Sequence, residues 1–228
     1  MTRLTTAALL IAGGLWLQPS VAFAQAADPP LMRLEASFGV LWIGSQPLGA
    51  SSANETTGAG GTTPLFSTTS ELASAAGIDG RIGVRVTRSL VAEAEASYLK
   101  PQLRVAISGD TEGAPALTAT EAIQQFTVGG GVLWYVPNRG WSPRVAPFAM
   151  AGAGYLRQLH EQNTLVETGS FIQFGGGAAY LLSSQPRFHM KGLGVRADLR
   201  AIRRSKGVAF DGGGRTAPTF GASAFVRF

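Results

Sequence analysis

The stretch IDGRIGVRVTRSLVAEAEASYL, residues 78–99, holds two segments of alternating residues joined by a short polar turn. On either side of Thr87-Arg88-Ser89, apolar residues recur at every second position, a period of two that is typical of β-strands. Most of the residues between them are charged or small. The stretch therefore predicts an antiparallel hairpin with one apolar face and one charged face.

The turn also sets the register of this hairpin. A three-residue turn that pairs Val86 with Leu90 places Arg81 opposite Glu95. The same register places Gly83 opposite Glu93, with Arg85 diagonal to Glu93. A slip of one residue would move every charge to the apolar side, so the pattern specifies this register strongly.

The same period continues along the rest of the chain. Strands are predicted near residues 32–45, 78–86, 90–99, 123–136, 144–156, 171–182, 188–202 and 217–228. The connections alternate in length: 47–77, 104–121, 160–170 and 203–217 are long, whereas 87–89, 137–142 and 183–187 are short. We predict an all-β fold, an eight-stranded antiparallel up-and-down transmembrane β-barrel with short periplasmic turns and long extracellular loops.

The first residues and the composition agree with export. An apolar run, Leu4–Leu17, is followed by Ala22-Phe23-Ala24, so residues 1–24 are predicted to be a cleaved signal peptide and 25–228 a single barrel domain. The chain has no cysteine, and only 14% of its residues are charged. Its net charge of +5 forms no long basic tract, and we expect no nucleic-acid partner.

Charged residues on the inward face predict a network inside the barrel. Its members are Arg81, Arg85, Glu93, Glu95, Arg196, Asp198, Arg200 and Arg227, with Glu35 near Arg227 where the barrel closes. One interpretation is an ion pathway or gate. The other, which we favour because eight strands leave little lumen, is a plug of paired charges. Outward aromatic residues near strand ends predict interfacial girdles: Trp42, Tyr98, Trp134 and Tyr180.

The segment 144–150 does not fit the pattern. It is apolar on both faces and contains Pro147, which cannot donate a hydrogen bond to a neighbouring strand. A bulge at Pro147, or a strand that starts just after it, would explain both facts. The faces of this strand stay unassigned.

The chain resembles the OmpA-type family of eight-stranded outer-membrane barrels from about Leu31 to Phe228. The resemblance is carried by the leader, the loop alternation, the segment 194–200 and the ending TFGASAFVRF. It implies that Phe220, Val226 and Phe228, with the alanines between them, form a signal for the barrel-assembly machinery. No segment resembles the periplasmic peptidoglycan-binding domain of the full-length family members.

Three functions remain open. The first is a structural or surface-interaction role in the bacterial outer membrane, with outer-membrane lipid and lipopolysaccharide as partners. The basic residues that could contact lipopolysaccharide are Arg203, Arg204, Lys206 and Arg215. The second is a small pore or an OmpW-like channel for small or apolar solutes. The third, a remote alternative, is a lipid A-modifying enzyme built on His160 or His189, with Thr164 as the hydroxyl nearest His160. We expect no enzyme, no cofactor and no metal site, and a monomer.

Overall fold

The computed structural model describes residues 34–56, 58, 60–137, 142, 144–161, 165–183, 190–207 and 214–228. The predicted signal peptide, Thr164 and His189 lie outside these residues. β-strands make up most of the described chain, and none of its helices has the length and hydropathy of a membrane span.

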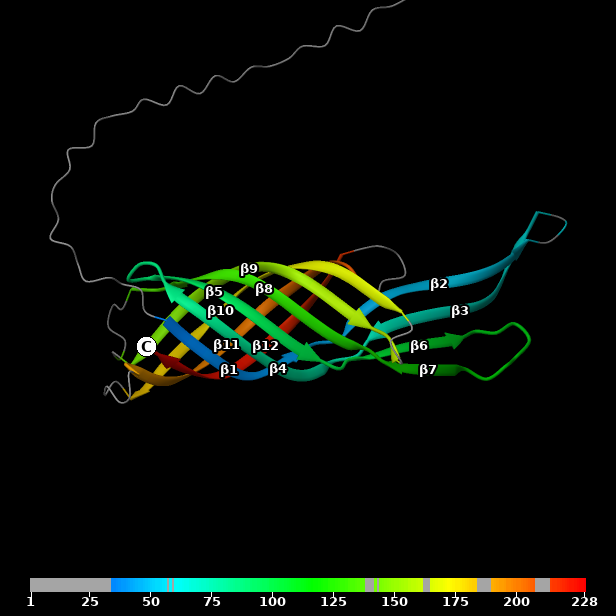
Figure 1. The fold of residues 1–228 in the computed structure, drawn as a ribbon. Helices are drawn as coiled ribbons and strands as arrows, with labels where there is room; N and C mark the ends of the chain where they lie inside the picture. The colour runs from blue at the N-terminus through cyan, green and yellow to red at the C-terminus, as the bar shows by residue number, and fades with distance from the viewer. Residues whose placement is uncertain are drawn as a thin grey trace, which may run out of the picture. The chain divides into compact units, whose positions relative to one another are not determined.

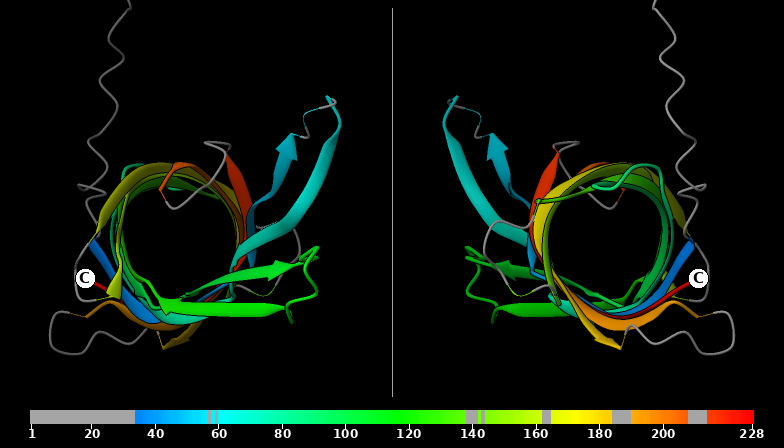
Figure 2. Two further views of the ribbon diagram at one scale, coloured as in Figure 1. Left: turned by 90° about the vertical axis from the view of Figure 1, so that its right-hand side faces the viewer. Right: turned by 90° about the vertical axis from the view of Figure 1, so that its left-hand side faces the viewer.

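Eight strands close into one barrel, which appears as a ring when it is viewed along its axis (Figures 1 and 2). They are β1 (Leu34–Ile43), β4 (Ala75–Arg85), β5 (Leu90–Leu99), β8 (Gln124–Tyr135), β9 (Val145–Leu159), β10 (Val166–Ser183), β11 (Gly192–Lys206) and β12 (Arg215–Arg227). Each strand pairs antiparallel with the barrel strands before and after it in the chain, and β1 pairs with β12 to close the ring. The predicted fold class is confirmed.

The two ends of the barrel differ, and we call them the terminal end and the sheet end. The terminal end holds Leu34 and Phe228, which are joined by a hydrogen bond from the Phe228 amide to the Leu34 carbonyl at 2.8 Å. The sheet end holds Ile43, paired with Thr219 and Ala75.

The hairpin of β4 and β5 has the register that its alternating charges predict. Arg81 pairs with Glu95 and Gly83 with Glu93. The Val86 amide donates to the Leu90 carbonyl at 2.9 Å, which closes the turn. Because successive side chains of a strand point to opposite faces, this register sends the charged set inward and the apolar set outward.

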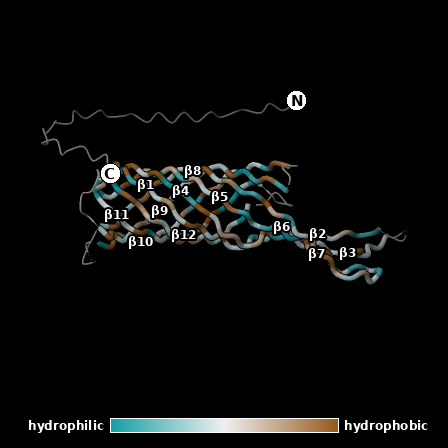
Figure 3. Tube along the Cα trace, turned by 60° about the horizontal axis from the view of Figure 1, so that its bottom comes forward, coloured by the Kyte–Doolittle hydropathy of each residue, from teal (hydrophilic) through white to brown (hydrophobic). Residues whose placement is uncertain are grey.

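Exposure alternates along the barrel strands in the same way. In β12, Phe220 is 47% exposed whereas Phe225, on the other face, is 1% exposed. Polar and apolar residues alternate along the barrel strands in Figure 3. The barrel therefore has a largely apolar outer surface, as a wall facing lipid would.

Pro147 lies within β9, in which Phe148 and Met150 are buried and Ala149, between them, is exposed. The ladder with β10 runs without a register shift from Tyr180 and Val145 past Pro147, so there is neither a bulge nor a late start. The Pro147 carbonyl accepts from the Val136 amide at 2.9 Å, beyond the last paired residues of β8 and β9. In an antiparallel strand, the backbone N and O of one residue point to the same neighbouring strand. The backbone N of Pro147, which carries no hydrogen, therefore points towards β8 at the place where the β8–β9 ladder ends.

The connections 47–77 and 104–121, predicted as loops, contain strands instead. These strands form a second antiparallel sheet of order β2-β3-β6-β7: β2 (Gln46–Thr56), β3 (Thr62–Leu72), β6 (Gln102–Ser108) and β7 (Leu117–Ala122) (Figure 1). Only Gly44 and Ser45 separate β1 from β2. The prediction missed them because serine, threonine and alanine on both faces of β2 and β3 give no apolar period, although paired strands still satisfy their backbone groups.

Candidate functional site

The predicted charge network occupies the middle of the lumen. The Arg196 guanidinium donates to both carboxylate oxygens of Glu93, at 2.7 and 3.1 Å. Arg81 donates to Asp198 Oδ2 at 3.0 Å, and Arg200 donates to Asp198 Oδ1 at 2.6 Å. These groups come from β4, β5 and β11, so the network joins strands on different sides of the barrel.

Pairing across the lumen differs from pairing along the sheet. Arg81 lies opposite Glu95 in the β4–β5 ladder, yet its guanidinium contacts Asp79 and Asp198. Glu95 instead accepts from Arg200 Nη1 at 3.1 Å and from the Gln173 amide. An arginine side chain is long enough to cross a narrow lumen, and its planar fork satisfies several acceptors at once.

The network also contains two polar residues that were not predicted to belong to it. Asp79 accepts from Arg81 Nε at 2.6 Å, and Gln173 accepts from Arg200 at 3.1 Å. Asp79 lies two residues before Arg81 on the same face, which is the signal that could have found it. With Asp79 and Glu35, five carboxylates (Glu35, Asp79, Glu93, Glu95 and Asp198) form ion pairs with four of the predicted arginines (Arg81, Arg196, Arg200 and Arg227).

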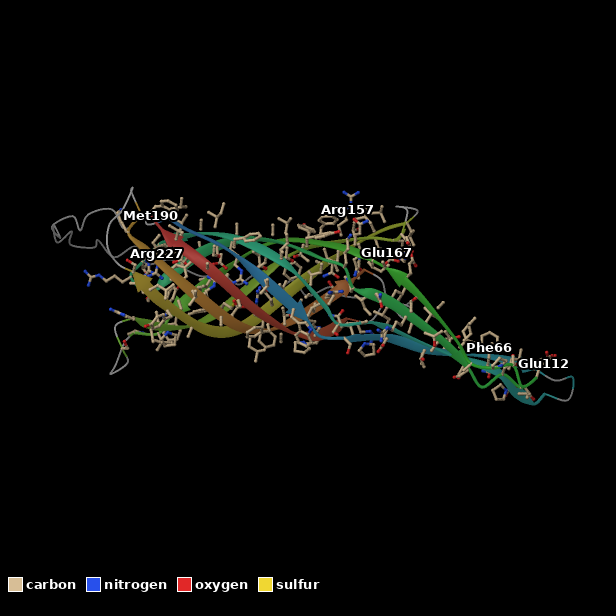
Figure 4. All side chains as sticks on the ribbon, turned by 90° about the horizontal axis from the view of Figure 1, so that it is seen from below. Phe66, Glu112, Arg157, Glu167, Met190 and Arg227 are labelled. Carbon is tan, nitrogen blue, oxygen red and sulfur yellow. The ribbon has the colours of Figure 1, made fainter. Side chains whose placement is uncertain are left out.

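Towards the terminal end the lumen holds an outer ion pair and an apolar cluster. Arg227 donates to Glu35 Oε2 at 2.7 Å, and its position at that end is labelled in Figure 4. The Arg85 guanidinium donates to the Arg88 carbonyl at 2.9 Å and lies 5.2 Å from the centroid of the Tyr135 ring. An apolar cluster fills this level: Val91, Leu133, Tyr135, Phe148, Met150, Ala179 and Phe225.

Towards the sheet end the network gives way to a second apolar cluster and a small cavity. The cluster comprises Leu41, Ile43, Ala75, Leu99 and Ala217. The cavity has a volume of about 20 Å³, and its apolar wall includes Leu99, Leu156, Phe171 and Ile202. Its polar wall includes Arg200, Arg204, Gln125 and Gln173. A space of this size holds about one water molecule. Two apolar layers and a charged layer between them therefore fill the described lumen.

The basic residues proposed to contact lipopolysaccharide do not share one surface. Arg203 and Lys206 are exposed, but Arg204 is only 6% exposed because its side chain alternates inward with Arg200. Arg215 is partly buried, and its Nη2 donates to the Leu48 carbonyl at 3.0 Å. The prediction of a surface role for Arg204 is wrong, because the alternation along β11 sends it into the lumen.

The outward face carries the predicted aromatic residues. Trp42 and Tyr98 lie near the sheet end, and Trp134 and Tyr180 lie near the terminal end. Trp42, Trp134 and Tyr180 are exposed, and so are Phe220 and Phe228 of the final strand. Between these two levels the exposed side chains are largely apolar, and they include Phe38, Val128, Ile172, Phe174 and Leu199.

Among the described residues, the ring of His160 lies beside two carboxylates. Its Nδ1 lies 3.0 Å from Glu121 Oε1, and its Nε2 lies 3.8 Å from Glu167 Oε1. Glu121 belongs to β7 and Glu167 to β10, so the histidine bridges the second sheet and the barrel. Within the described ranges, no three histidine, cysteine or acidic residues are grouped so that they could hold a metal ion.

No model of a known protein family matches the chain, and no curated protein matches it in sequence. Among solved structures, it is similar to the outer membrane protein OprG from Pseudomonas aeruginosa, at 12% identity and a TM-score of 0.49, over 86% of this chain and 96% of that one. It is also similar to Neisserial surface protein A, at 14% identity and a TM-score of 0.46, over 85% and 95% of the two chains. A third is Ail, the attachment invasion locus protein of Yersinia pestis, at 10% identity and a TM-score of 0.43, over 87% and 100%.

Proposed function

We propose that the chain is an integral barrel of the bacterial outer membrane that does not conduct, and that its role lies in the surface it presents outside the membrane. The observation that carries this proposal is the filled lumen. The Arg196–Glu93 pair and the ion pairs around Asp198 occupy its middle, with apolar clusters on either side.

The outer surface supports the membrane location. A contiguous apolar surface larger than a few hundred Å² marks a membrane or protein contact. On β8, the outward aromatic residues Phe126 and Trp134 are eight positions apart. At ~3.3 Å per residue and a tilt of about 40°, this spacing spans roughly 20 Å of membrane, close to the ~25 Å apolar band of such barrels.

The second sheet supports a surface role. It follows directly from β1 at the sheet end, away from the chain terminus, which makes that end the extracellular one in a barrel with short periplasmic turns. Its base is held by an apolar cluster of Leu48, Leu72, Leu103 and Ile123. Phe66 and Leu117 are exposed and lie farther from this base. Phe66 is labelled on the second sheet in Figure 4. Arg203 and Lys206 are the basic residues left for contact with lipopolysaccharide.

Conductance across a planar bilayer tests this proposal. The chain is refolded in detergent, and its folding is checked by the mobility shift between unboiled and boiled samples on a gel. We expect the folded chain to be silent, and an Arg196→Ala/Arg81→Ala variant to show conductance because the middle layer is opened. Steady unit conductance of the unmodified chain would contradict the proposal.

A second candidate is a channel for small apolar solutes, which would have to widen the cavity of about 20 Å³ at the sheet end. Leu99, Leu156 and Phe171 form part of its wall, but the charge network lies at its terminal side. Uptake of an apolar fluorescent solute into vesicles distinguishes the two functions. Uptake by an electrically silent barrel would favour the channel, and no uptake favours the surface role.

A further inference from the structure

Arg204 is a buried arginine that lacks a carboxylate partner. It lies on the inward face of β11, and only 6% of it is exposed. Its Nη2 is buried without a hydrogen-bond partner, and no ion pair to its guanidinium is found within the described part of the chain. An unpaired buried charge is costly, so this arrangement requires a compensating group.

A second arginine lies beside Arg204. Arg215, on β12, lies directly opposite Arg204 in the ladder. Like charges that face each other across a pair of strands destabilise the pair. Farther down the lumen, the five carboxylates of the network already form ion pairs with four other arginines.

The carboxylates nearest to Arg204 in the cavity are held by another arginine. Asp79 and Glu95 line the same cavity, but Arg200 lies 3.8 Å from Asp79 Oδ2 and 3.1 Å from Glu95 Oε2. The Gln125 side-chain oxygen, also in the wall, accepts from the Gln158 amide at 3.1 Å. One acceptor of the wall, Asp79 Oδ1, is buried without a hydrogen-bond partner, but no ion pair joins Asp79 to Arg204 among the described residues, and Arg204 Nη2 also has no partner.

We propose that Arg204 binds a small inorganic monoanion, of the size of chloride or bromide, in this cavity. The volume of about 20 Å³ admits one small ion and excludes a phosphate or a fatty acid. The bound anion neutralises Arg204 and completes the filling of the lumen at the sheet end. The site does not depend on whether the second sheet binds a partner.

Anion-dependent stability tests the site. The full chain is folded in detergent and dialysed into sodium gluconate, whose anion is too large for the cavity. Bromide then replaces gluconate at constant ionic strength. The midpoint temperature of the gel-mobility transition is measured for the unmodified chain, for Arg204→Gln and for Arg203→Gln. Arg203 is the matched control because it is the exposed neighbour of Arg204 on the same strand.

We expect bromide to raise the midpoint saturably in the unmodified chain and in Arg203→Gln, and to leave Arg204→Gln unchanged. In gluconate, Arg204→Gln should unfold at a higher temperature than the unmodified chain, because the uncompensated charge is gone. Crystals grown in bromide should show an anomalous scattering peak beside the Arg204 guanidinium.

Two results would overturn the proposal. One is a bromide response that is absent from the unmodified chain or equal in Arg204→Gln. The other concerns Asp211, which lies outside the described residues. If Asp211→Asn lowered the midpoint in gluconate and the unmodified chain ignored bromide, that carboxylate would be the counter-charge in place of an anion.

Discussion

Arg196 and Glu93 illustrate how single residues hold the lumen together. Both are buried, and two hydrogen bonds join the guanidinium to the carboxylate. The attraction within such a pair is largely offset by the cost of removing both charges from water. Loss of one partner is different, because it leaves the other charge buried and uncompensated.

Replacing Arg196 by methionine should therefore lower the free energy of unfolding by roughly 3–5 kcal/mol. Unfolding by urea, with the chain in lipid vesicles, measures this change. Arg203→Met is the control on the exposed face of the same strand and should change the value by no more than about 0.5 kcal/mol. In Arg196→Met/Glu93→Leu, where both charges are removed, part of the loss should be recovered. Equal stability of Arg196→Met and the unmodified chain would show that Glu93 is not left uncompensated.

At the scale of elements, glycines in β10 make room for the network. Gly175 and Gly177 face the lumen beside Arg200 and Asp198, their partners in β11. A Cβ added to Gly177 would lie 2.1 Å from the Ala197 carbonyl oxygen and 2.8 Å from the Asp198 Cα, both of which are backbone atoms. The ladder would have to move, because no flexible side chain can yield there.

Gly177→Ala should destabilise the barrel by about 1–3 kcal/mol through this overpacking. The matched control is Gly130→Ala in β8, where the nearest atom to the added Cβ is the Glu93 carbonyl oxygen at 3.5 Å. The free energy of unfolding in vesicles is compared for the two variants. A Gly177→Ala barrel as stable as Gly130→Ala would mean that the close approach of β10 and β11 is not required.

The final strand forms part of the apolar outer face and closes the ring. Phe220 and Phe228 point outward, and β12 pairs with both β1 and β11. We propose that Phe228 also serves as a recognition signal during assembly. Phe228→Ala should then slow assembly by the barrel-assembly machinery in reconstituted vesicles several-fold while leaving unassisted refolding in detergent almost unchanged. An equal slowing of both reactions would assign Phe228 a purely structural role.

At the scale of the whole molecule, the second sheet and the barrel are held by separate clusters. The cluster of Leu48, Leu72, Leu103 and Ile123 lies at the base of the second sheet, whereas the barrel is filled by the charge network and its own two clusters. Beyond Ser51 and Thr68, β2 and β3 continue to pair with each other as a hairpin.

Replacing residues 52–67 by a Gly-Ser turn should therefore leave the barrel folded. We expect an unchanged gel-mobility shift and an unfolding free energy within about 1 kcal/mol of the full chain, because the described residues of this segment pair with β2, β3 and β6 and not with a barrel strand. Loss of the mobility shift would show instead that the barrel depends on the hairpin. A folded variant that no longer binds a surface partner would assign the binding to this sheet.

The barrel could be predicted from the sequence because its information is local. A period of two, short turns and an inward set of charges specify strands, their faces and their register, and closure follows because a lipid-facing sheet cannot leave an edge unpaired. The hairpin at residues 78–99 shows this, since Arg81 lies opposite Glu95 as its alternation requires. The second sheet was missed because β2 and β3 expose mostly small polar residues and carry little periodic signal.

The sequence by itself determined which face of the regularly alternating strands lines the lumen, since alternation along a strand needs no knowledge of the other strands. Only the tertiary structure decided which charges meet. Arg81 contacts Asp198 rather than Glu95, because closure of the ring brings β11 across from β4 and long side chains reach over the lumen. For the same reason, only the closed barrel shows that Arg204 Nη2 has no hydrogen-bond partner, since whether a charge is compensated depends on every strand around it.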